Sequence, residues 1–318
     1  MKNQALKFFC REGESMYDVI VIGAGPAGLT AALYAARAGK SVKVFEKENI
    51  GGQILYSPLV ENYPGIPHMP GSLFSEQLSE QVRNLGVEIK MTEVAKIEQT
   101  SDGFVLHTPI GDEISKTVIL ATGVQHRKLG IYGEDNLVGA GVSYCAVCDG
   151  AFYTGEDVAV IGGGDTALQD AIFLASTSAH VTLIHRRDEF RAEASLVKKA
   201  MENPKIEIIK NYVADEFIVD NGFVQGLFIK DNATGLVQEI NVKGIFVAIG
   251  QKPQNDAFAN LGDLDESGYF DSSEDMLTKV PGVFVAGDAR KKTVRQLTTA
   301  VGDGASAALA ACKYIDAQ

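Results

Sequence analysis

Two cysteines separated by two residues are the part of this chain best suited to redox chemistry. Cys145 and Cys148 lie within residues 141–150, and an acidic residue, Asp149, directly follows the second cysteine. Thiols at this spacing form and break a disulfide, and a neighbouring carboxyl group can supply the proton that a leaving thiolate takes up. We predict that Cys145, Cys148 and Asp149 are catalytic. Asp149 as a simple turn or cap residue is the alternative.

A metal site is the other interpretation of a Cys-x-x-Cys pair. Such a site needs two further Cys or His ligands at matching spacing. The sequence has no second Cys-x-x-Cys, and its five histidines are scattered; His126, the nearest to the pair, is expected on the surface of a linker. We therefore expect no metal. Cys10 is expected to be incidental, and Cys312 to be a packed apolar residue late in a helix.

A glycine-rich turn near the N-terminus predicts a dinucleotide site. Residues 17–22 are an apolar stretch typical of a buried strand, and the turn 23–28, Gly-Ala-Gly-Pro-Ala-Gly, leads from it into good helix formers. The three glycines permit a tight turn, the approach of a pyrophosphate to the backbone, and close packing of helix on strand. The helix N-terminus offers free N–H groups to the phosphates. Glu46, which ends the next predicted strand, can accept a hydrogen bond from a ribose hydroxyl.

The same pattern recurs 139 residues later. Residues 157–164 match residues 18–25, and the match continues without a gap to the second strand, where 181–185 correspond to 42–46. Apolar strands that end in glycine, at 118–123 and 242–250, extend the likeness. The chain therefore contains two nucleotide-binding units, in keeping with the two domains that 318 residues suggest at roughly 150 residues per domain.

The two units differ where their second strands end. The first ends in Glu46, whereas the second continues into His185, Arg186 and Arg187, with Arg191 close behind. Arginines suit the 2′-phosphate of NADPH, which an acid would repel. We predict NADPH in the second unit, where Ala167 replaces the third glycine. A solvated basic turn is the alternative.

A carrier must connect the nicotinamide to the disulfide. Nicotinamides deliver a hydride, and a flavin accepts it and passes the electron pair to a disulfide sulfur. The first unit is therefore predicted to bind FAD. A late strand ends in Gly287–Asp288, which can bind a ribityl hydroxyl, and the helix that starts near Gln296 can stabilise negative charge on a reduced ring.

Bulk properties are those of a globular protein. The chain is 46% hydrophobic and 22% charged, and its net charge of −12 argues against non-specific nucleic-acid binding. The apolar run 19–36 is broken by glycines and a proline, so no membrane span is expected. The N-terminus lacks the apolar core of a signal peptide, which favours the cytoplasm. Residues 1–15 are expected to be a flexible leader.

Taken together, these motifs resemble the low-molecular-weight bacterial thioredoxin reductases, class II of the pyridine nucleotide-disulfide oxidoreductases. The matching motifs run in family order from Met16 to the C-terminal helix: Gly23–Gly28, Gly51–Gln53, Glu61–Gly65, Ala121–Gly123, Cys145–Asp149, Gly162–Ala167, His185–Asp188 with Arg191, Gly287–Asp288 and Arg295–Gln296. The leader and residues 301–304, Val-Gly-Asp-Gly, depart from the usual pattern, as does the second linker, 251–255.

The resemblance implies a fold and a partner. The fold is α/β, with two Rossmann-like three-layer nucleotide-binding domains. An NADPH domain, 127–252, carries the cysteines and is inserted into a discontinuous FAD domain, 16–126 and 253–318. The protein would be a homodimer that reduces a thioredoxin-like disulfide. Cys148 would lie next to the flavin, Cys145 would attack the partner, and Asp149 would be the acid.

The resemblance also extends the predicted binding sites. The FAD-binding residues are expected to be Gly23, Gly25, Pro26, Ala27, Gly28, Glu46, Gly52, Gln53, Asn62, Val94, Ala121, Thr122, Gly123, Gly287, Asp288, Arg295, Gln296 and Leu297. The NADPH-binding residues are expected to be Gly162, Gly163, Gly164, Asp165, Thr166, Ala167, His185, Arg186, Arg187, Arg191, Ile249 and Gly250.

Other functions remain as alternatives. A ferredoxin-dependent flavin thioredoxin reductase would use another donor, but relatives of that kind tend to lack the second glycine motif and its arginines. A flavin dithiol oxidase would act on a small thiol and consume oxygen. The hydroperoxide-reductase subunit carries extra N-terminal domains, for which 15 residues leave no room. A non-enzymatic redox sensor would not need the intact Cys-x-x-Cys-Asp.

Overall fold

The chain divides into two units, and the computed structural model describes residues 16–57 and 59–318. Unit 1 is drawn from Met1–Ile54, Leu73–Val124 and Pro253–Gln318, and unit 2 from Leu55–Ser72 and Gln125–Lys252. Residues 55–72 group with unit 2, whereas the sequence-based division assigns them to the first domain. The predicted leader and Cys10 lie outside the described residues.

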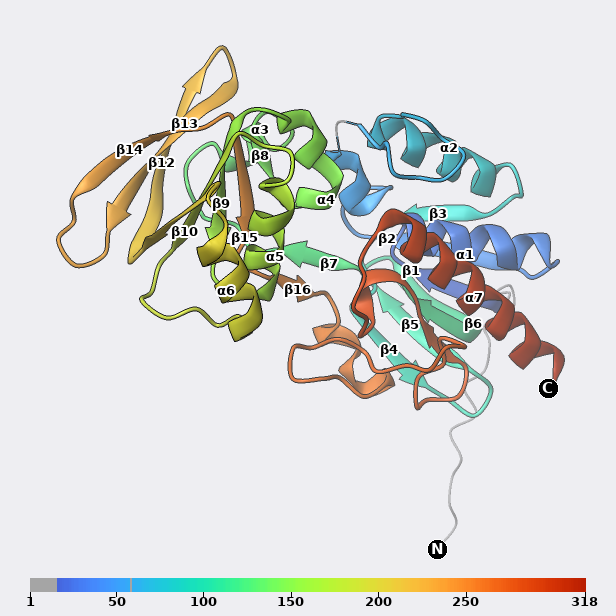
Figure 1. Cartoon of the computed structure of the whole chain (residues 1–318). Helices are drawn as coiled ribbons and strands as arrows, with labels where there is room; N and C mark the ends of the chain where they lie inside the picture. Colours follow the sequence, from blue (N-terminus) through green and yellow to red (C-terminus); the bar gives the residue numbers. More distant parts are fainter. Residues whose placement is uncertain (1–15, 58) are drawn as a thin grey trace, which may run out of the picture. The chain divides into compact units, whose positions relative to one another are not determined.

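The sheet of unit 1 is mostly parallel (Figure 1). Strand β1 (Tyr17–Ile22) lies between β2 (Val42–Glu46) and β6 (Gly111–Leu120) and is parallel to both. Strand β3 (Glu88–Met91) extends the sheet beyond β2, and β17 (Val283–Val285) pairs with the last part of β6. On the far side, β5 (Phe104–Thr108) pairs antiparallel with the first part of β6, and β4 (Lys96–Gln99) pairs antiparallel with β5.

Side chains that point alternately to the two faces of β1 contribute to both core layers of unit 1. Val19 and Val21 face one way and pack with helices α1 (Pro26–Arg37) and α7 (Leu297–Asp316), which lie side by side in Figure 1. Ile20 and Ile22 face the other way, into a cluster with residues of β4, β5 and the 3₁₀ helix η3 (Asp256–Leu261). Successive side chains of a strand point to opposite faces, so one apolar strand supplies both halves of the core. Helix α2 (Gly71–Arg83) packs Val82 against the helical side.

Unit 2 repeats this plan. Its parallel sheet has the order β11 (Ile206–Lys210), β10 (His180–His185), β9 (Asp157–Gly162), β15 (Gly244–Ala248) and β8 (Val142–Ser143). Helices α5 (Asp165–Leu174) and α6 (Ala194–Glu202) share a core cluster on one face. The three-stranded antiparallel sheet of β12 (Tyr212–Asp220), β13 (Phe223–Asp231) and β14 (Val237–Asn241) supplies the cluster on the other face.

The internal repeat extends to the strand register. Val19 is paired with Val42 in unit 1, and Val158 with Val181 in unit 2, both separated by the same 139 positions. The neighbouring pairs keep this offset through Ile22 and Ile161. The predicted fold, two Rossmann-like three-layer α/β units, is confirmed. Strands β7 (Val124–His126) and β16 (Gln251–Pro253) pair where the chain passes from one unit to the other.

Small residues allow α1 and α7 to approach closely. A Cβ atom on Gly304 would lie 2.2 Å from the carbonyl oxygen of Ala27, so the two helix backbones touch at this point. A Cβ atom on Gly302, two residues earlier, would meet nothing within 4 Å. None of the described helices is both long and apolar enough to cross a membrane.

The two glycines of α7 offer a matched test of this packing. We expect Gly304→Ala to lower the free energy of unfolding by roughly 1–3 kcal/mol, because the added methyl must push two backbones apart. Gly302→Ala should raise it by roughly 0.5–1 kcal/mol, because alanine favours helix. Urea unfolding followed by circular dichroism measures both. Equal stability of the two variants would contradict close α1–α7 packing.

Candidate functional site

The turn after β1 is closed by contacts that require glycine. A Cβ atom on Gly23 would lie 2.2 Å from the carbonyl oxygen of Ala121, and one on Gly28 would lie 1.8 Å from the carbonyl oxygen of Gly23. Gly23 also has a φ of 104°, which other residues rarely adopt. Helix α1 begins at Pro26, and its N-cap residue, Gly25, provides no side-chain cap. The N-terminal N–H groups therefore lack a side-chain partner and suit a phosphate.

A cavity of about 220 Å³ adjoins this turn. Its lining includes Gly23, Glu46, Val94 and Thr122, which the sequence predicts as FAD-binding residues from four separate segments. Ligand pockets usually have volumes of roughly 300–1,000 Å³, so this cavity suits one part of a dinucleotide.

The carboxylate of Glu46, predicted to accept a hydrogen bond from a ribose hydroxyl, is already held by the protein backbone. It is 9% exposed, and its two carboxylate oxygens accept hydrogen bonds from the N–H groups of Ala24 at 2.7 Å and Glu48 at 2.8 Å. Each oxygen has a second lone pair. Glu46 therefore holds the glycine turn and retains the capacity to accept a ligand hydroxyl.

The C-terminal part of the predicted FAD site lies around the start of α7. Gly287 and Asp288 form the 3₁₀ helix η4 (Gly287–Ala289), and Gln296 caps α7 in a capping box with Thr299, so Leu297 is the first helical residue. Asp288 Oδ1 and Arg295 Nε are buried and have no hydrogen-bond partner among the described residues. Burial raises the pKa of Asp288, while Lys292 and Arg295 oppose that rise.

Asp288 Oδ1 has Lys292 Nζ beside it at 3.5 Å, and Asp288 and Arg295 together fit a flavin nucleotide. Buried polar groups rarely go without a partner, so Asp288 calls for a donor such as a ribityl hydroxyl, and Arg295 for an acceptor. Arg295 is held against the ring of Tyr269, with 4.2 Å between the guanidinium carbon and the ring centre. The residues of unit 1 therefore match the predicted cofactor in chemistry.

Asn255 belongs to the same region, although no sequence pattern marked it as functional. It is fully buried, accepts a hydrogen bond from Thr122 at 2.8 Å, and donates to the carbonyl oxygen of Ala289 at 2.8 Å. It thereby ties the turn after β6, predicted as Ala121 to Gly123, to the end of η4. The only available signal was a polar residue in a linker.

The remaining predicted FAD residues are placed less uniformly. Gly52 and Gln53 begin the 3₁₀ helix η1 (Gly52–Tyr56), and a Cβ atom on Gly52 would lie 3.4 Å from the Cα of Gly25. Ala27 follows Pro26 in the first turn of α1. Asn62 lies in 55–72, which groups with unit 2, so it is not among the residues that unit 1 brings together.

The second glycine turn repeats the geometry of the first. A Cβ atom on Gly162 would lie 2.3 Å from the carbonyl oxygen of Ala248. Gly164 caps α5 without a side-chain bond, and Asp165, Thr166 and Ala167 form its first turn. Asp165 accepts a hydrogen bond from the N–H of Glu193 at 2.7 Å. Ile249 and Gly250 follow β15, whose last residue pairs with Gly162, so they lie at the same edge of the sheet.

The basic segment after β10 separates into buried and exposed parts. His185 is 6% exposed, and its ring packs against Gly163, where a Cβ atom would come within 2.1 Å of it. It therefore supports the glycine turn from within the protein. The side chains of Arg186, Arg187 and Arg191 are exposed and make no ion pair with any described residue. The N–H of Arg191 donates to the carbonyl oxygen of Gly163 at 2.8 Å, which holds these cations beside the turn.

The cysteine pair is joined by a disulfide and begins a short helix. Cys145 caps α4 (Ala146–Asp149), its sulfur accepts a hydrogen bond from the N–H of Cys148 at 3.2 Å, and their Cα atoms are 5.3 Å apart. Both residues are partly exposed. Cys312 is buried in α7, as expected. Among the described residues, no group of three or more His, Cys, Asp or Glu side chains could hold a metal ion.

Asp149 has the environment of a proton donor. Burial raises the pKa of its carboxyl group, and a 2.6 Å hydrogen bond from Ser143 opposes that rise. Its Oδ1 has no partner among the described residues. Ser143 also accepts a hydrogen bond from the N–H of Cys145 at 3.0 Å, so one hydroxyl connects the acid to the disulfide. No sequence pattern marks Ser143 as functional.

His126 is not the exposed linker residue that the sequence predicts. It is half-buried in β7, and its ring stacks on Tyr144 with 4.9 Å between ring centres. The Tyr144 hydroxyl donates to the buried Glu134 at 2.7 Å, and Glu134 also accepts from the N–H groups of Leu129 and Gly130. The expectation fails because Tyr144, the residue before Cys145, covers the imidazole. Burial lowers the pKa of His126 to about 4.

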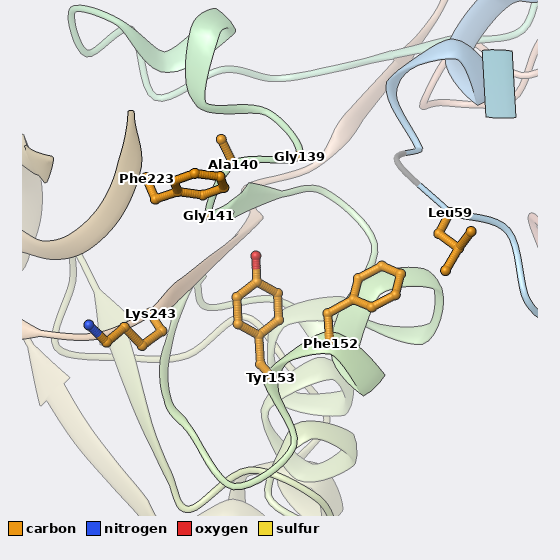
Figure 2. Close-up of a pocket in the computed structure, with 8 residues that line it drawn as sticks. All are labelled: Leu59, Gly139, Ala140, Gly141, Phe152, Tyr153, Phe223 and Lys243. Atoms are coloured by element: carbon orange, nitrogen blue, oxygen red, sulfur yellow. The ribbon is translucent and has the colours of Figure 1, made fainter. Parts of the chain in front are cut away.

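A pocket of about 290 Å³ is lined by residues that precede and follow the cysteines in the sequence (Figure 2). The turn 139–141, shortly before the cysteines, forms one wall, and Phe152 and Tyr153, shortly after them, form another. Figure 2 shows Phe152 facing Leu59 and the Tyr153 hydroxyl pointing toward Gly141, with Lys243 on the other side. Phe152 is 41% exposed, and so this surface is partly apolar.

Two Rossmann-like units and a disulfide beside a buried carboxyl group define a nucleotide-dependent disulfide oxidoreductase. Comparison with known proteins agrees. The family model for pyridine nucleotide-disulphide oxidoreductase matches residues 17–304. The thioredoxin reductase of Bacillus subtilis (strain 168) is 39% identical over 95% of this chain and 96% of its own length. That of Peptoclostridium acidaminophilum is 42% identical over 96% and 98%.

A solved structure gives the same result. The crystal structure of thioredoxin reductase from Streptococcus pyogenes MGAS5005 is 40% identical, covers 96% of this chain and 100% of its own, and has a TM-score of 0.92. This chain belongs to the pyridine nucleotide-disulphide oxidoreductase family, and the resemblance to bacterial thioredoxin reductases is confirmed.

The buried His126 predicts a specific pH dependence of stability. Its folded pKa of about 4 lies below the unfolded value of 6.5, so the unfolded chain binds the extra proton and stability falls as the pH drops from 6.5 toward 4. At pH 5 this loss amounts to at most about 2 kcal/mol, since one pKa unit corresponds to about 1.4 kcal/mol. His126→Phe keeps an aromatic ring on Tyr144 and should remove the loss.

The measurement compares urea unfolding at pH 7.5 and pH 5. The difference in unfolding free energy between the two pH values should be smaller in His126→Phe than in the wild type. His68→Phe, at an exposed histidine, is the control and should leave that difference unchanged. An unchanged difference in His126→Phe would refute the buried, neutral imidazole.

Proposed function

We propose that this protein is a thioredoxin-disulfide reductase that passes electrons from NADPH through FAD and the Cys145–Cys148 disulfide to an oxidised thioredoxin. One observation carries the proposal: the disulfide lies beside a buried Asp149 carboxyl group, in the unit that also holds the second glycine turn. The relatives named thioredoxin reductase match nearly the whole chain, which supports the same activity.

FAD is assigned to unit 1 and NADPH to unit 2. FAD is supported by the uncapped N-terminus of α1, by Glu46 and by Asp288, whose Oδ1 has no hydrogen-bond partner among the described residues. The exposed arginines after β10 support a 2′-phosphate. When bound, the flavin supplies a two-electron carrier between hydride and disulfide. The division into an FAD domain and an inserted NADPH domain is proposed on the same grounds.

The residues around the disulfide carry the second half of the reaction. Once reduced, Cys145 attacks one sulfur of the partner disulfide and forms a mixed disulfide, and Cys148 then displaces the reduced partner. The partner leaves with two added protons and two added electrons, and the Cys145–Cys148 bond is restored. Asp149, with its raised pKa, donates a proton to a departing thiolate, and Ser143 holds it in place.

The surface next to the disulfide suits a protein substrate. Val147, between the two cysteines, is 52% exposed, and Phe152 follows at 41%. Exposed apolar side chains at this position favour contact with another protein surface over binding of a small polar thiol. This supports a thioredoxin-like partner. We also propose, from the family resemblance, that the protein is a homodimer.

The alternative electron donor is not favoured. A ferredoxin-dependent enzyme would need neither a second glycine turn nor cations for a 2′-phosphate, and this chain has both. Anaerobic titration of the flavin absorbance with NADPH, NADH and reduced ferredoxin separates the donors. A dithiol oxidase would instead consume oxygen without NADPH.

The cysteines provide the first test of the proposed function. We expect Cys145→Ser and Cys148→Ser each to lower thioredoxin reduction by at least about 10³-fold, because a single thiol cannot regenerate the internal disulfide. Bleaching of the flavin by NADPH should persist in both variants, because it precedes disulfide chemistry. Insulin-coupled thioredoxin reduction and stopped-flow absorbance measure the two steps.

Cys312→Ala is the matched control for these variants. Cys312 is the free cysteine of the described residues and is buried in α7. Its replacement should leave thioredoxin reduction near the wild-type rate. If Cys145→Ser retained steady-state thioredoxin reduction, the proposed function would be wrong.

The exposed arginines provide a test of the nucleotide. Replacement of Arg186, Arg187 and Arg191 by alanine should lower kcat/KM for NADPH by roughly 100-fold and leave that for NADH nearly unchanged, because only NADPH has a 2′-phosphate to pair with them. Steady-state kinetics with both nucleotides measure this ratio. Lys198→Ala, at an exposed cation of the same unit, is the control. Equal losses with both nucleotides would contradict phosphate recognition.

A further inference from the structure

A buried charged residue in the middle of α7 has no role in the function proposed so far. Asp303 lies in the segment 301–304, Val-Gly-Asp-Gly, and it is 8% exposed. Burying a carboxylate is costly unless it is paired and hydrogen-bonded. Asp303 is therefore held in place by specific partners, and those partners identify what it does.

Asp303 accepts three hydrogen bonds from the segment just before α7. Its Oδ2 accepts from the N–H of Gly287 at 3.2 Å and from Lys292 Nζ at 3.0 Å. Its Oδ1 accepts from Arg290 Nη1 at 3.3 Å. The side chains of Lys292 and Arg290 are themselves only 9% and 15% exposed. One carboxylate thus holds the residues on both sides of Asp288.

Lys292 connects this network to two predicted flavin contacts. Its Nζ lies 3.5 Å from Asp288 Oδ1, the buried oxygen without a hydrogen-bond partner among the described residues. The same Nζ donates to Thr299 Oγ1 at 3.2 Å, and Thr299 closes the capping box of Gln296. Lys292 therefore reaches both the Asp288 carboxylate and the N-terminus of α7.

The glycine turn of β1 adjoins this network. A Cβ atom on Gly287 would lie 2.7 Å from the Cβ of Ala27, and one on Gly304, next to Asp303, would lie 2.2 Å from the Ala27 carbonyl oxygen. The pyrophosphate turn, η4 and α7 are thus packed together around Ala27. These segments are far apart in the sequence, and Asp303 supplies charged hydrogen bonds between two of them.

We propose that Asp303 is a positioning residue for the flavin site, which holds Lys292 against Asp288 and fixes η4 to the start of α7. The inference rests on the proposed function, in that FAD binds at Asp288 and α7. A site whose polar groups are already arranged loses less free energy when its ligand binds. Lys292 keeps a cation beside Asp288, so that this partly buried carboxyl group stays an acceptor for the ligand.

The experiment measures FAD binding to the full-length protein after removal of its flavin, by titration of flavin fluorescence. Asp303→Asn keeps the size of the side chain but not its charge, and should raise the Kd for FAD about tenfold or more, because hydrogen bonds to charged groups typically contribute about that much. Lys292→Met should have a similar effect, and the double variant should lose little more than either one. Lys292→Arg should restore much of the affinity.

Two further readouts separate positioning from general stability. The absorption spectrum of bound flavin should shift in Asp303→Asn and Lys292→Met, because the polar surroundings of the ring system change. Asp263→Asn, which removes an exposed carboxylate paired with Lys279 in the same unit, is the matched control and should change neither spectrum nor Kd. Melting of the flavin-free protein reports the stability of each variant.

The outcomes are distinct. If the wild type binds FAD and both Asp303→Asn and Lys292→Met bind it within twofold, with unchanged spectra, the inference is wrong and the proposed function stands. If the wild type binds no FAD, both are wrong. If Asp303→Asn fails to fold, Lys292→Met and Lys292→Arg decide the question alone.

Discussion

A side chain at Gly23 or at Gly162 would collide with a carbonyl oxygen, and both nucleotide sites depend on that close approach. The two oxygens belong to Ala121 and Ala248, each at the end of a strand parallel to the one that leads into the turn. Because Gly23 and Gly162 have no side chains, each turn can lie directly against the carboxyl edge of its sheet. The helix N-terminus then starts at that edge, where ligands bind in folds of this kind.

The two units share this frame, but the residues that follow their second strands differ. In unit 1 the second strand ends in Glu46, which is buried and accepts hydrogen bonds from the N–H of Ala24 in the turn and from the N–H of Glu48 just after the strand. In unit 2 the equivalent position is His185, which is also buried and also supports its turn. The difference that matters for recognition comes just after it, where arginines are exposed and unpaired among the described residues. Burial therefore gives His185 a structural role, whereas the arginines that follow it remain exposed.

Much of this could be predicted from the sequence. The glycine turns, the parallel strands and the cysteine pair depend on local pattern and short spacing, and the 139-residue repeat extended to the strand register. His126 was assigned wrongly, because its exposure depends on Tyr144, which reaches it only in the folded protein. Ser143, Asn255 and Glu134 were missed for a related reason. Each is a common polar residue whose importance lies in the side-chain and backbone groups that it meets in the folded protein.

By itself, the sequence determined two nucleotide-binding units, a redox cysteine pair with an adjacent acid, and the contrast between an acid after one second strand and cations after the other. These follow from residue type and short-range order, since glycine, cysteine and arginine carry their chemistry wherever the turn places them. Only the tertiary structure decided how the site is supported: that Ser143 holds Asp149, and that Asp303 holds Lys292 beside Asp288. Such contacts join segments that are separated by irregular lengths of chain, so no sequence pattern predicts them. A charged group needs a partner only where the fold buries it, and burial is known only from the tertiary structure.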